Sequence, residues 1–452
     1  SLERRGDECW TTFRGARHPV ALVTGSHHMQ GYWHETGEGR PLGKLPYIYL
    51  FEAERWIPRR AAFLGPLDAP AHGEEGRWNR ACIRCHTTHG KPRIRPREDM
   101  QTQVAEFGIA CEACHGPALE HASENRNPLR RYRYHMGTER DPTLIQPEEL
   151  SAPLSAQVCG QCHGIWEYFD LDDQLQGEVH GFPYRPGDDL DETRLVVRTA
   201  HVESGEPGPA NLAAIRADPR YLADRFWSDG MVRVSGREYN GLIESPCFEG
   251  GEFSCTSCHR MHPSATDPRP LAEWAAAQLG LGMDGDEACL QCHADFRERI
   301  SEHTKHAASS AGSRCYNCHM PYTTYGLLKA IRSHQVDSPD VTASVETGRP
   351  NACNQCHLDK SLGWAAAELE TRYGIAPPEL SRDQREVAAG VLWALEGDAG
   401  QRALAAWSFG WEPAREAAGS GRDRGRKSEF RRAVPGVRGS GFVRDPRHGE
   451  SR

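Results

Sequence analysis

The sequence is poor in apolar residues and contains no long hydrophobic run. Hydrophobic residues make up 38% of the 452 residues, and the mean hydropathy is −0.68. The longest apolar stretch, LPYIYLF from Leu45, is far shorter than the roughly 20 residues that cross a bilayer. We therefore expect no transmembrane segment. The 45 glycines and 30 prolines predict many loops and a thin core of side chains.

Two further features are missing, an excess of positive charge and a targeting segment at the start. The formal net charge is −9 and the sequence pI is about 6.2, so we expect no nucleic-acid partner. The chain opens on SLERRGDECW, which has no basic head followed by an apolar segment. We expect that a signal peptide has been removed.

Cysteine, in contrast, is abundant and strictly patterned. Fourteen of the sixteen cysteines lie in seven copies of C-x-x-C-H, although chance predicts roughly 0.03 copies in a chain of this composition. Only Cys9 and Cys247 lie outside the motifs. In chain order, the motif cysteines and histidines are Cys82, Cys85 and His86; Cys111, Cys114 and His115; Cys159, Cys162 and His163; Cys255, Cys258 and His259; Cys289, Cys292 and His293; Cys315, Cys318 and His319; Cys353, Cys356 and His357.

This pattern indicates covalent c-type haem. Two thiols form thioethers with the haem vinyl groups, and the adjacent imidazole reaches the iron as its first axial ligand. Zinc would need two C-x-x-C pairs, or one pair and two histidines, for each ion, and it does not require a histidine after every second cysteine. A disulfide framework suits much shorter chains. The sequence thus predicts seven haems and an extracytoplasmic location, periplasmic or otherwise, where such haems are attached.

The spacing of the motifs predicts a mainly α fold with many loops, organised around stacked haems. Stretches such as YIYLFEAERWIPRR, from Tyr47 to Arg60, alternate enough to suggest short strands in the first region. Ser381 and Gln384 stand in capping-box order at the start of a helix near the end of the chain. The predicted regions are a haem-free segment packed on the haem lobe (1–75), haems one to three (76–163), a loop-rich haem-free insert (164–254), haems four to seven (255–358), a short helical region of possible HEAT-like repeats (359–418), and a basic disordered tail (419–452).

The second axial ligands must come from histidines outside the motifs. The chain has 22 histidines, and removing the seven motif histidines leaves fifteen. His121 and His262 lie close to anchors, where each would serve a neighbouring haem rather than its own. His18, His34, His72 and His448 are expected at the surface. The full set of candidate ligands is His27, His28, His121, His262, His303, His306 and His334.

At CEACHGPALEH, HTKH, CYNCHMP, RSHQVDSP and GRPNACNQCHLDKSLGWAA the sequence resembles multihaem c-type cytochromes related to hydroxylamine oxidoreductase and pentahaem nitrite reductase. The resemblance covers roughly residues 20 to 370 and extends to relatives with a helical-repeat region. It implies a haem-stacked helical lobe with His/His ligation, and it places distal ligands at His121, at His303 or His306, and at His334. Relatives often carry a further C-x-x-C-H at the amino end. Here Cys9 has neither a second cysteine nor a histidine, so it is a free thiol or a disulfide partner of Cys247.

Three functions are compatible with these features. The first is electron transfer through a chain of mostly bis-histidine haems, with redox partner proteins such as membrane quinol oxidase-type proteins or other cytochromes. The second is an oxidoreductase that acts on a nitrogen or sulfur oxyanion or on hydroxylamine at one open haem. Arg237, Glu238 and Tyr239 of GREYNG are its candidate polar groups, although we interpret GREYNG as a turn. The third is a structural haem scaffold or filament subunit, and oligomers are possible.

Overall fold

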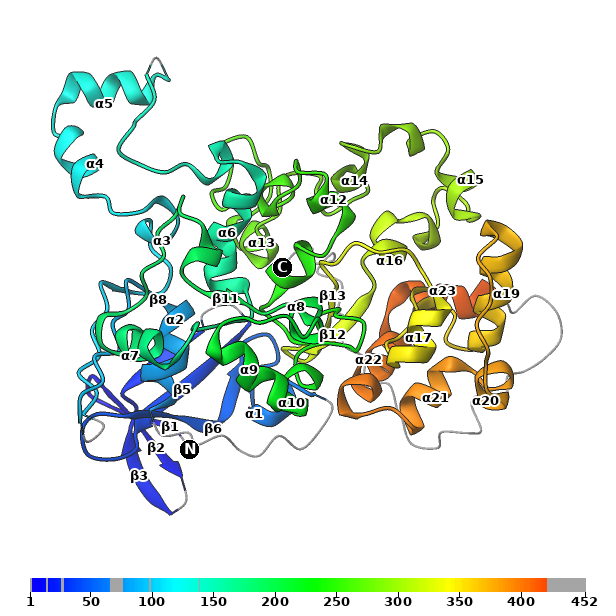
Figure 1. The fold of residues 1–452 in the computed structure, drawn as a ribbon, viewed down its shortest axis with the longest axis horizontal. Helices are drawn as coiled ribbons and strands as arrows, with labels where there is room; N and C mark the ends of the chain where they lie inside the picture. Colours follow the sequence, from blue (N-terminus) through cyan, green and yellow to red (C-terminus); the bar gives the residue numbers. More distant parts are fainter. Residues whose placement is uncertain are drawn as a thin grey trace, which may run out of the picture.

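The computed structural model describes residues 2–13, 15–25, 28–65, 76–96, 99–137 and 139–420. Figure 1 shows an elongated body, with the N-terminal strands at one end and the C-terminal helices at the other. The haem anchors lie between these ends. His27, His72 and the stretch 421–452, which includes His448 and nearly all of the predicted tail, fall outside the described residues.

Two antiparallel sheets form the N-terminal region, more β structure than the mainly helical prediction allowed for. Trp33 and Ile48 are buried at the centre of the larger sheet, where apolar residues alternate along the chain. The strands expected between Tyr47 and Arg60 are confirmed. The sheets are β1 (Leu2–Arg5), β2 (Glu8–Phe13) and β3 (Ala16–Pro19), then β4 (Leu22–Thr24), β5 (Met29–Glu35), β6 (Leu42–Leu50) and β7 (Arg55–Pro58), followed by helix α1 (Arg59–Ala62).

The anchors lie on or beside short helical turns rather than long helices. The third anchor is the exception, because it ends the twelve-residue helix α6 (Ala152–His163). The other turns are η1 (Trp78–Cys82), α2 (Ile83–His86), α3 (Glu112–His115), η5 (Cys255–Ser257), α14 (Glu287–Leu290), α16 (Cys315–His319) and α18 (Ala352–Cys356).

An arm leaves the body between the second and third anchors. It carries α4 (Leu119–Glu124) and α5 (Pro128–His135), neither of which buries a residue. Figure 1 shows both helices standing away from the remaining elements. The strand pair β8 (Thr87–Thr88) and β9 (Glu106–Phe107) precedes the arm in the chain, and the turn η3 (Pro147–Glu149) follows it.

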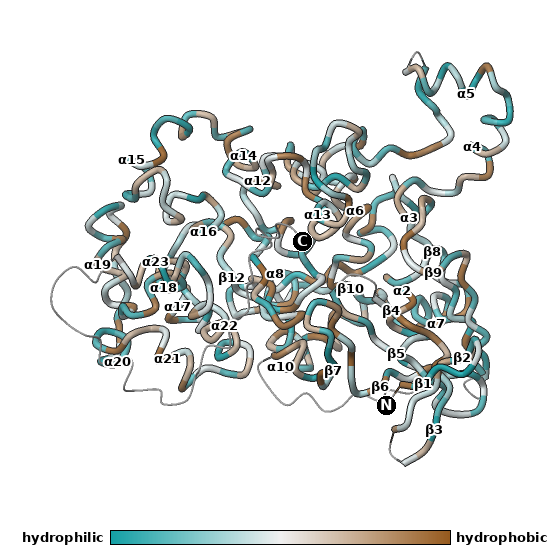
Figure 2. The backbone as a smooth tube through the Cα atoms, turned by 180° about the vertical axis from the view of Figure 1, so that it is seen from behind, coloured by the Kyte–Doolittle hydropathy of each residue, from teal (hydrophilic) through white to brown (hydrophobic). Residues whose placement is uncertain are grey.

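The haem-free interval after the third anchor has a hydrophobic core of its own. Ile165, Val197, Leu212 and Phe226 belong to one buried cluster within it. Its elements are β10 (Trp166–Glu167), α7 (Leu171–His180), η4 (Leu190–Glu192), β11 (Leu195–Val196), α8 (Thr199–Glu203), α9 (Ala210–Ala217), α10 (Pro219–Ala223), α11 (Glu238–Leu242) and α12 (Pro246–Glu249). Figure 2 shows hydrophobic chain concentrated in the middle of the body, around α8.

The chain then runs through the last four anchors and ends in a group of short helices. The last anchor and these helices share one buried hydrophobic cluster. It includes Leu358, Leu362, Ala389 and Trp393, and partly buried Cys353 packs against it. The capping box of Ser381 and Gln384 is confirmed. The elements are α13 (Leu271–Ala277), η6 (Ala294–Phe296), α15 (Ile300–Thr304), η7 (Ala311–Ser313), β12 (Tyr322–Gly326), β13 (Lys329–Arg332), α17 (Val341–Thr347), α19 (Leu362–Tyr373), α20 (Arg382–Glu386), α21 (Ala389–Leu395), α22 (Ala399–Gly410) and α23 (Glu412–Ser420).

Within the described ranges, no helix is both long and apolar enough to cross a membrane. HEAT-like repeats in the helical region, and the region boundaries given above, remain predictions.

Candidate haem-binding site

The motifs share a backbone geometry that suits haem attachment. In motifs that include those of His115, His259, His293 and His357, the backbone N–H of the histidine donates to the backbone carbonyl of the first cysteine at 2.9 Å. One helical turn places residues three apart on the same face, so both thiols of each motif face the same side. All sixteen cysteines are free. In the described part of the chain, no three histidine, cysteine or acidic side chains converge to hold a metal ion, which is the arrangement that a zinc site would require.

Four motif histidines face another histidine across a constant gap. The centroid distances are 6.0 Å for His115 and His262, 6.4 Å for His259 and His334, 6.1 Å for His319 and His303, and 6.4 Å for His357 and His306. The ring planes differ by 10° to 27°. Two imidazoles on opposite sides of one metal ion have centroids about 6.3 Å apart, given metal–nitrogen bonds of about 2.0 Å. The four gaps therefore have the width of one iron ion.

Backbone carbonyls orient several of these rings. The Nδ1–H of His115 donates to the carbonyl of Ile145 at 2.7 Å, and that of His319 to Asp337 at 2.9 Å. His259 donates to Ala277 at 3.1 Å. A carbonyl oxygen can only accept, so Nδ1 carries the proton and Nε2 is left with its lone pair. This is the tautomer that binds a metal through Nε2.

Three motif histidines lack such a partner, since no histidine ring in the described residues faces His86, His163 or His293. The ring across from His86 belongs to Trp78, at 6.4 Å and 39°, and the one near His293 belongs to Phe296, at 6.4 Å. Burial, followed by the nearby charges of Lys44 and Arg237, lowers the pKa of His86. The anchors thus fall into two groups, four with paired histidines and three without.

The segment GREYNG holds the third anchor. We expected a turn, but only its start is one, and Glu238 begins α11. Arg237 donates to the carbonyl of Cys162 at 2.9 Å, and the carboxylate of Glu238 accepts from Nδ1 of His163 at 2.8 Å. Burial acts to raise the pKa of Glu238, but the bond and the charge of His163 outweigh it, so that the pKa falls to about 2.

The ring of the next residue, Tyr239, packs against the helix that carries the third anchor. It lies so close to Gly160 on α6 that a Cβ there would meet it at 2.9 Å. The interpretation as a turn was wrong because residues of the haem-free interval pack on an anchor 75 positions earlier in the chain.

Neighbouring anchors meet through hydrogen bonds. The Cys85 thiol donates to the carbonyl of Cys162 at 3.5 Å, Gln161 of the third anchor donates to the carbonyl of Ala113 of the second at 2.9 Å, and Gln291 of the fifth donates to the carbonyl of Ser257 of the fourth at 3.3 Å. The contact with Cys162 lowers the pKa of Cys85 to about 6. Ser155 on the helix of the third anchor lies 3.3 Å from Thr256 of the fourth, and Asp286 beside the fifth anchor accepts from the backbone N–H of Cys315 of the sixth at 2.9 Å. The helices α16 and α18, which carry the last two anchors, pack together. The anchors therefore form a continuous series from the third to the seventh, and the first and second both meet the third.

A buried cation next to the first and third anchors suits the acidic groups of haem. Arg194 is 3% exposed, and its guanidinium lies 4.0 Å from the centroid of the Trp166 ring. It donates to the carbonyl of Gln161 at 2.7 Å, while its Nε has no hydrogen-bond partner in the described residues. Arg194 forms no ion pair within the residues that the structure describes. A buried cation calls for an anion, and each haem carries two propionates, so the residues present fit this group.

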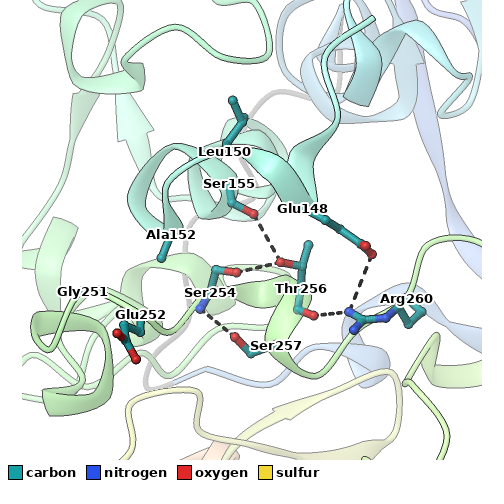
Figure 3. A pocket seen from close by; sticks show the side chains of 10 residues that line it. All are labelled: Glu148, Leu150, Ala152, Ser155, Gly251, Glu252, Ser254, Thr256, Ser257 and Arg260. Carbon is teal, nitrogen blue, oxygen red and sulfur yellow. Dashed lines mark hydrogen bonds and ion pairs between the residues drawn. The ribbon is translucent and has the colours of Figure 1, made fainter. Parts of the chain in front are cut away.

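Figure 3 shows a polar cavity between the start of α6 and the fourth anchor, with a volume of about 420 Å³. Thr256 and Ser257, the middle residues of the fourth motif, line it. Ser254 Oγ lies 2.8 Å from Thr256 Oγ1, and Arg260 lies 3.6 Å from Glu148 across the opening. At the anchor itself, the backbone N–H of Ser254 donates to Ser257 Oγ at 3.1 Å, which helps to fix the backbone before the first cysteine.

The remaining predicted residues are more dispersed. His28 is exposed and lies just before strand β5. His121 lies on the arm, where its Nδ1 bonds Asp141 at 2.7 Å and no motif histidine faces it among the described residues. His34 was expected at the surface but is 8% exposed, with its ring 4.8 Å from that of His18. No signal in the sequence marked it as buried.

The alternative of a Cys9–Cys247 disulfide is wrong. Both thiols are free. Cys9 lies in β2, whereas the thiols electrostatically coupled to Cys247 are those of Cys289 and Cys292 at the fifth anchor.

Repeated anchors, the helical turns that carry them and the paired imidazoles define a multihaem c-type cytochrome that binds covalent haem c. The family model for the doubled CXXCH motif matches residues 246–298, which include the fourth and fifth anchors. The chain is 24% identical over 258 residues to cytochrome c nitrite reductase subunit NrfA of Nitratidesulfovibrio vulgaris. That match covers 57% of this chain and 34% of the relative, so the chain spans about a third of the relative's length. Among solved structures, the outer cell wall cytochrome OcwA aligns with 88% of this chain and 86% of its own, at 18% identity and a TM-score of 0.44.

Proposed function

We propose that the chain carries seven haems and transfers electrons along them outside the cytoplasm. The observation that carries this proposal is the series of contacts between neighbouring anchors. When bound, each haem takes up and releases one electron at its iron. Because the thiols hold the haem edges, contacts such as that of Cys85 with Cys162 bring neighbouring haems close together.

The paired histidines support a role in transfer rather than in substrate binding. His262, His303, His306 and His334 occupy the positions opposite four motif histidines. An iron with imidazoles on both sides has no free position for a substrate. These four positions would therefore relay electrons, and redox proteins such as other cytochromes would supply and accept them.

The surroundings of His86 favour a second candidate function. The facing ring is that of Trp78, which cannot ligate iron, and the cations Lys44 and Arg237 are near enough to affect His86. An open iron beside two cations suits a small anion. A nitrogen or sulfur oxyanion reductase, with the remaining haems as its electron supply, is therefore the alternative.

Two measurements test the main proposal. Intact-mass spectrometry after export in a host that attaches c-type haem should give the apoprotein plus seven haems, and six or eight would contradict the count. Electron paramagnetic resonance of the oxidised protein should then show at least four low-spin haems, because four histidine pairs are in place. A dominant high-spin signal would favour the reductase instead.

A further inference from the structure

The third anchor differs from the others in the group that its histidine meets. His115, His259 and His319 each bond a backbone carbonyl through Nδ1. Among motif histidines in the described part of the chain, His163 alone bonds a carboxylate, at 2.8 Å from Glu238 Oε2.

That carboxylate is fixed on its other side. Glu238 Oε1 accepts from the backbone N–H of Gly236 at 2.9 Å. The neighbouring Arg237 is bonded to the carbonyl of Cys162, which belongs to the same anchor. The carboxylate therefore cannot turn away from the imidazole without breaking contacts on both sides.

A carboxylate acceptor changes what the imidazole does to an iron. It draws the Nδ1 proton towards itself more strongly than a carbonyl does, which makes Nε2 a stronger donor. A stronger donor stabilises the oxidised iron, as does a nearby negative charge, and both effects lower the reduction potential.

A lower potential at the third anchor affects electron transfer because this anchor contacts three others. The carbonyl of Cys162 accepts from the Cys85 thiol of the first anchor, Gln161 donates to the carbonyl of Ala113 of the second, and Ser155 on the helix of the third anchor lies 3.3 Å from Thr256 of the fourth. The third anchor is therefore the junction through which the first and second communicate with the rest.

We propose that Glu238 is a positioning residue that lowers the potential of the haem at His163, the junction between the first two anchors and the rest. The inference rests on the proposed function, because it requires a haem at each of the anchors concerned. Electron transfer between the first two anchors and the remaining ones then depends on the hydrogen bond that the Glu238 side chain accepts.

The test is a comparison of Glu238→Gln with Glu167→Gln in the fully haem-loaded protein. The substituted glutamine side chain is neutral and close to glutamate in shape. Glu167 is a second carboxylate, four residues after His163, but it accepts from the hydroxyl of Tyr221 at 2.6 Å and bonds no imidazole. Difference spectroelectrochemical titration should show one haem in the Glu238→Gln protein that is at least tenfold easier to reduce, which is about 59 mV for one electron. The Glu167→Gln protein should titrate like the parent.

Two outcomes would overturn the proposal, namely no shift in Glu238→Gln or an equal shift in both variants. Intact mass separates these outcomes from a failure of the proposed function, since a parent with fewer than seven haems refutes that function directly. If Glu238→Gln loses a haem, Glu238→Asp retains the charge one methylene further back and should show an upward shift in the same haem. An unchanged potential in a fully loaded Glu238→Asp protein would then refute the inference.

Discussion

Replacing His334 with Ala should open one iron and leave the rest of the molecule in place. The ring lies 6.4 Å from that of His259, with the planes 20° apart. Its Nδ1 is buried and has no hydrogen-bond partner among the described residues. Axial ligands set haem potentials over a range of about 0.8 V, so we expect the affected haem to shift by on the order of 0.1 V.

The loop that carries His334 is held by other groups. Ser245 Oγ donates to the His334 carbonyl at 3.0 Å and accepts from the Val336 N–H at 2.9 Å. Gly241 packs so closely that a Cβ there would lie 2.8 Å from the backbone nitrogen of Gln335. The loop should therefore keep its course without the imidazole.

The assay is carbon monoxide binding to the reduced protein. The His334→Ala protein should bind one equivalent more than the parent, while His135→Ala, which removes an exposed imidazole at the end of α5, should bind the same as the parent. If His334→Ala gains no carbon monoxide, His334 is not a distal ligand. The carbon monoxide that the parent protein binds measures how many of its irons are open. One equivalent bound by the parent would favour the reductase.

Three further predictions concern stability. Asp398→Ala should lower the free energy of unfolding in urea by about 2–4 kcal/mol, because it removes the cap of α22 and leaves half-buried Arg233, now 2.7 Å away, without its ion-pair partner; a loss below about 1 kcal/mol would mean that the pair is solvated. Burial lowers the pKa of His34, so the stability it contributes is complete above about pH 6.5 and is lost as the pH falls. The parent should therefore lose more stability than His34→Gln between about pH 7.5 and about pH 5.5, and equal losses would contradict this. Gly160→Ala should cost about 1–3 kcal/mol because Tyr239 must shift, and an unchanged melting temperature would show that the ring moves freely.

The anchors could be predicted from the sequence because their chemistry is local. Two thiols and an imidazole within five residues identify the haem whatever surrounds them. The strands after Tyr47 and the cap at Ser381 were likewise predictable from short patterns.

The contacts between anchors could not be predicted, because they depend on how distant segments pack. His262 follows the fourth motif in the chain, yet its ring lies against His115 of the second. Glu238 and His163 meet across 75 residues with no shared pattern. His34 is buried by two sheets that form only when strands from separate stretches pair.

The contacts between thiols of separate anchors also bear on how the protein matures. In an oxidising compartment, neighbouring free thiols such as Cys85 and Cys162 would be exposed to cross-linking as soon as the folded arrangement formed. A cysteine that has formed a thioether with a haem vinyl group can no longer form a disulfide. For the exported protein that we propose, we therefore expect haem attachment to precede the packing of the anchors, so that the chain folds around its cofactors.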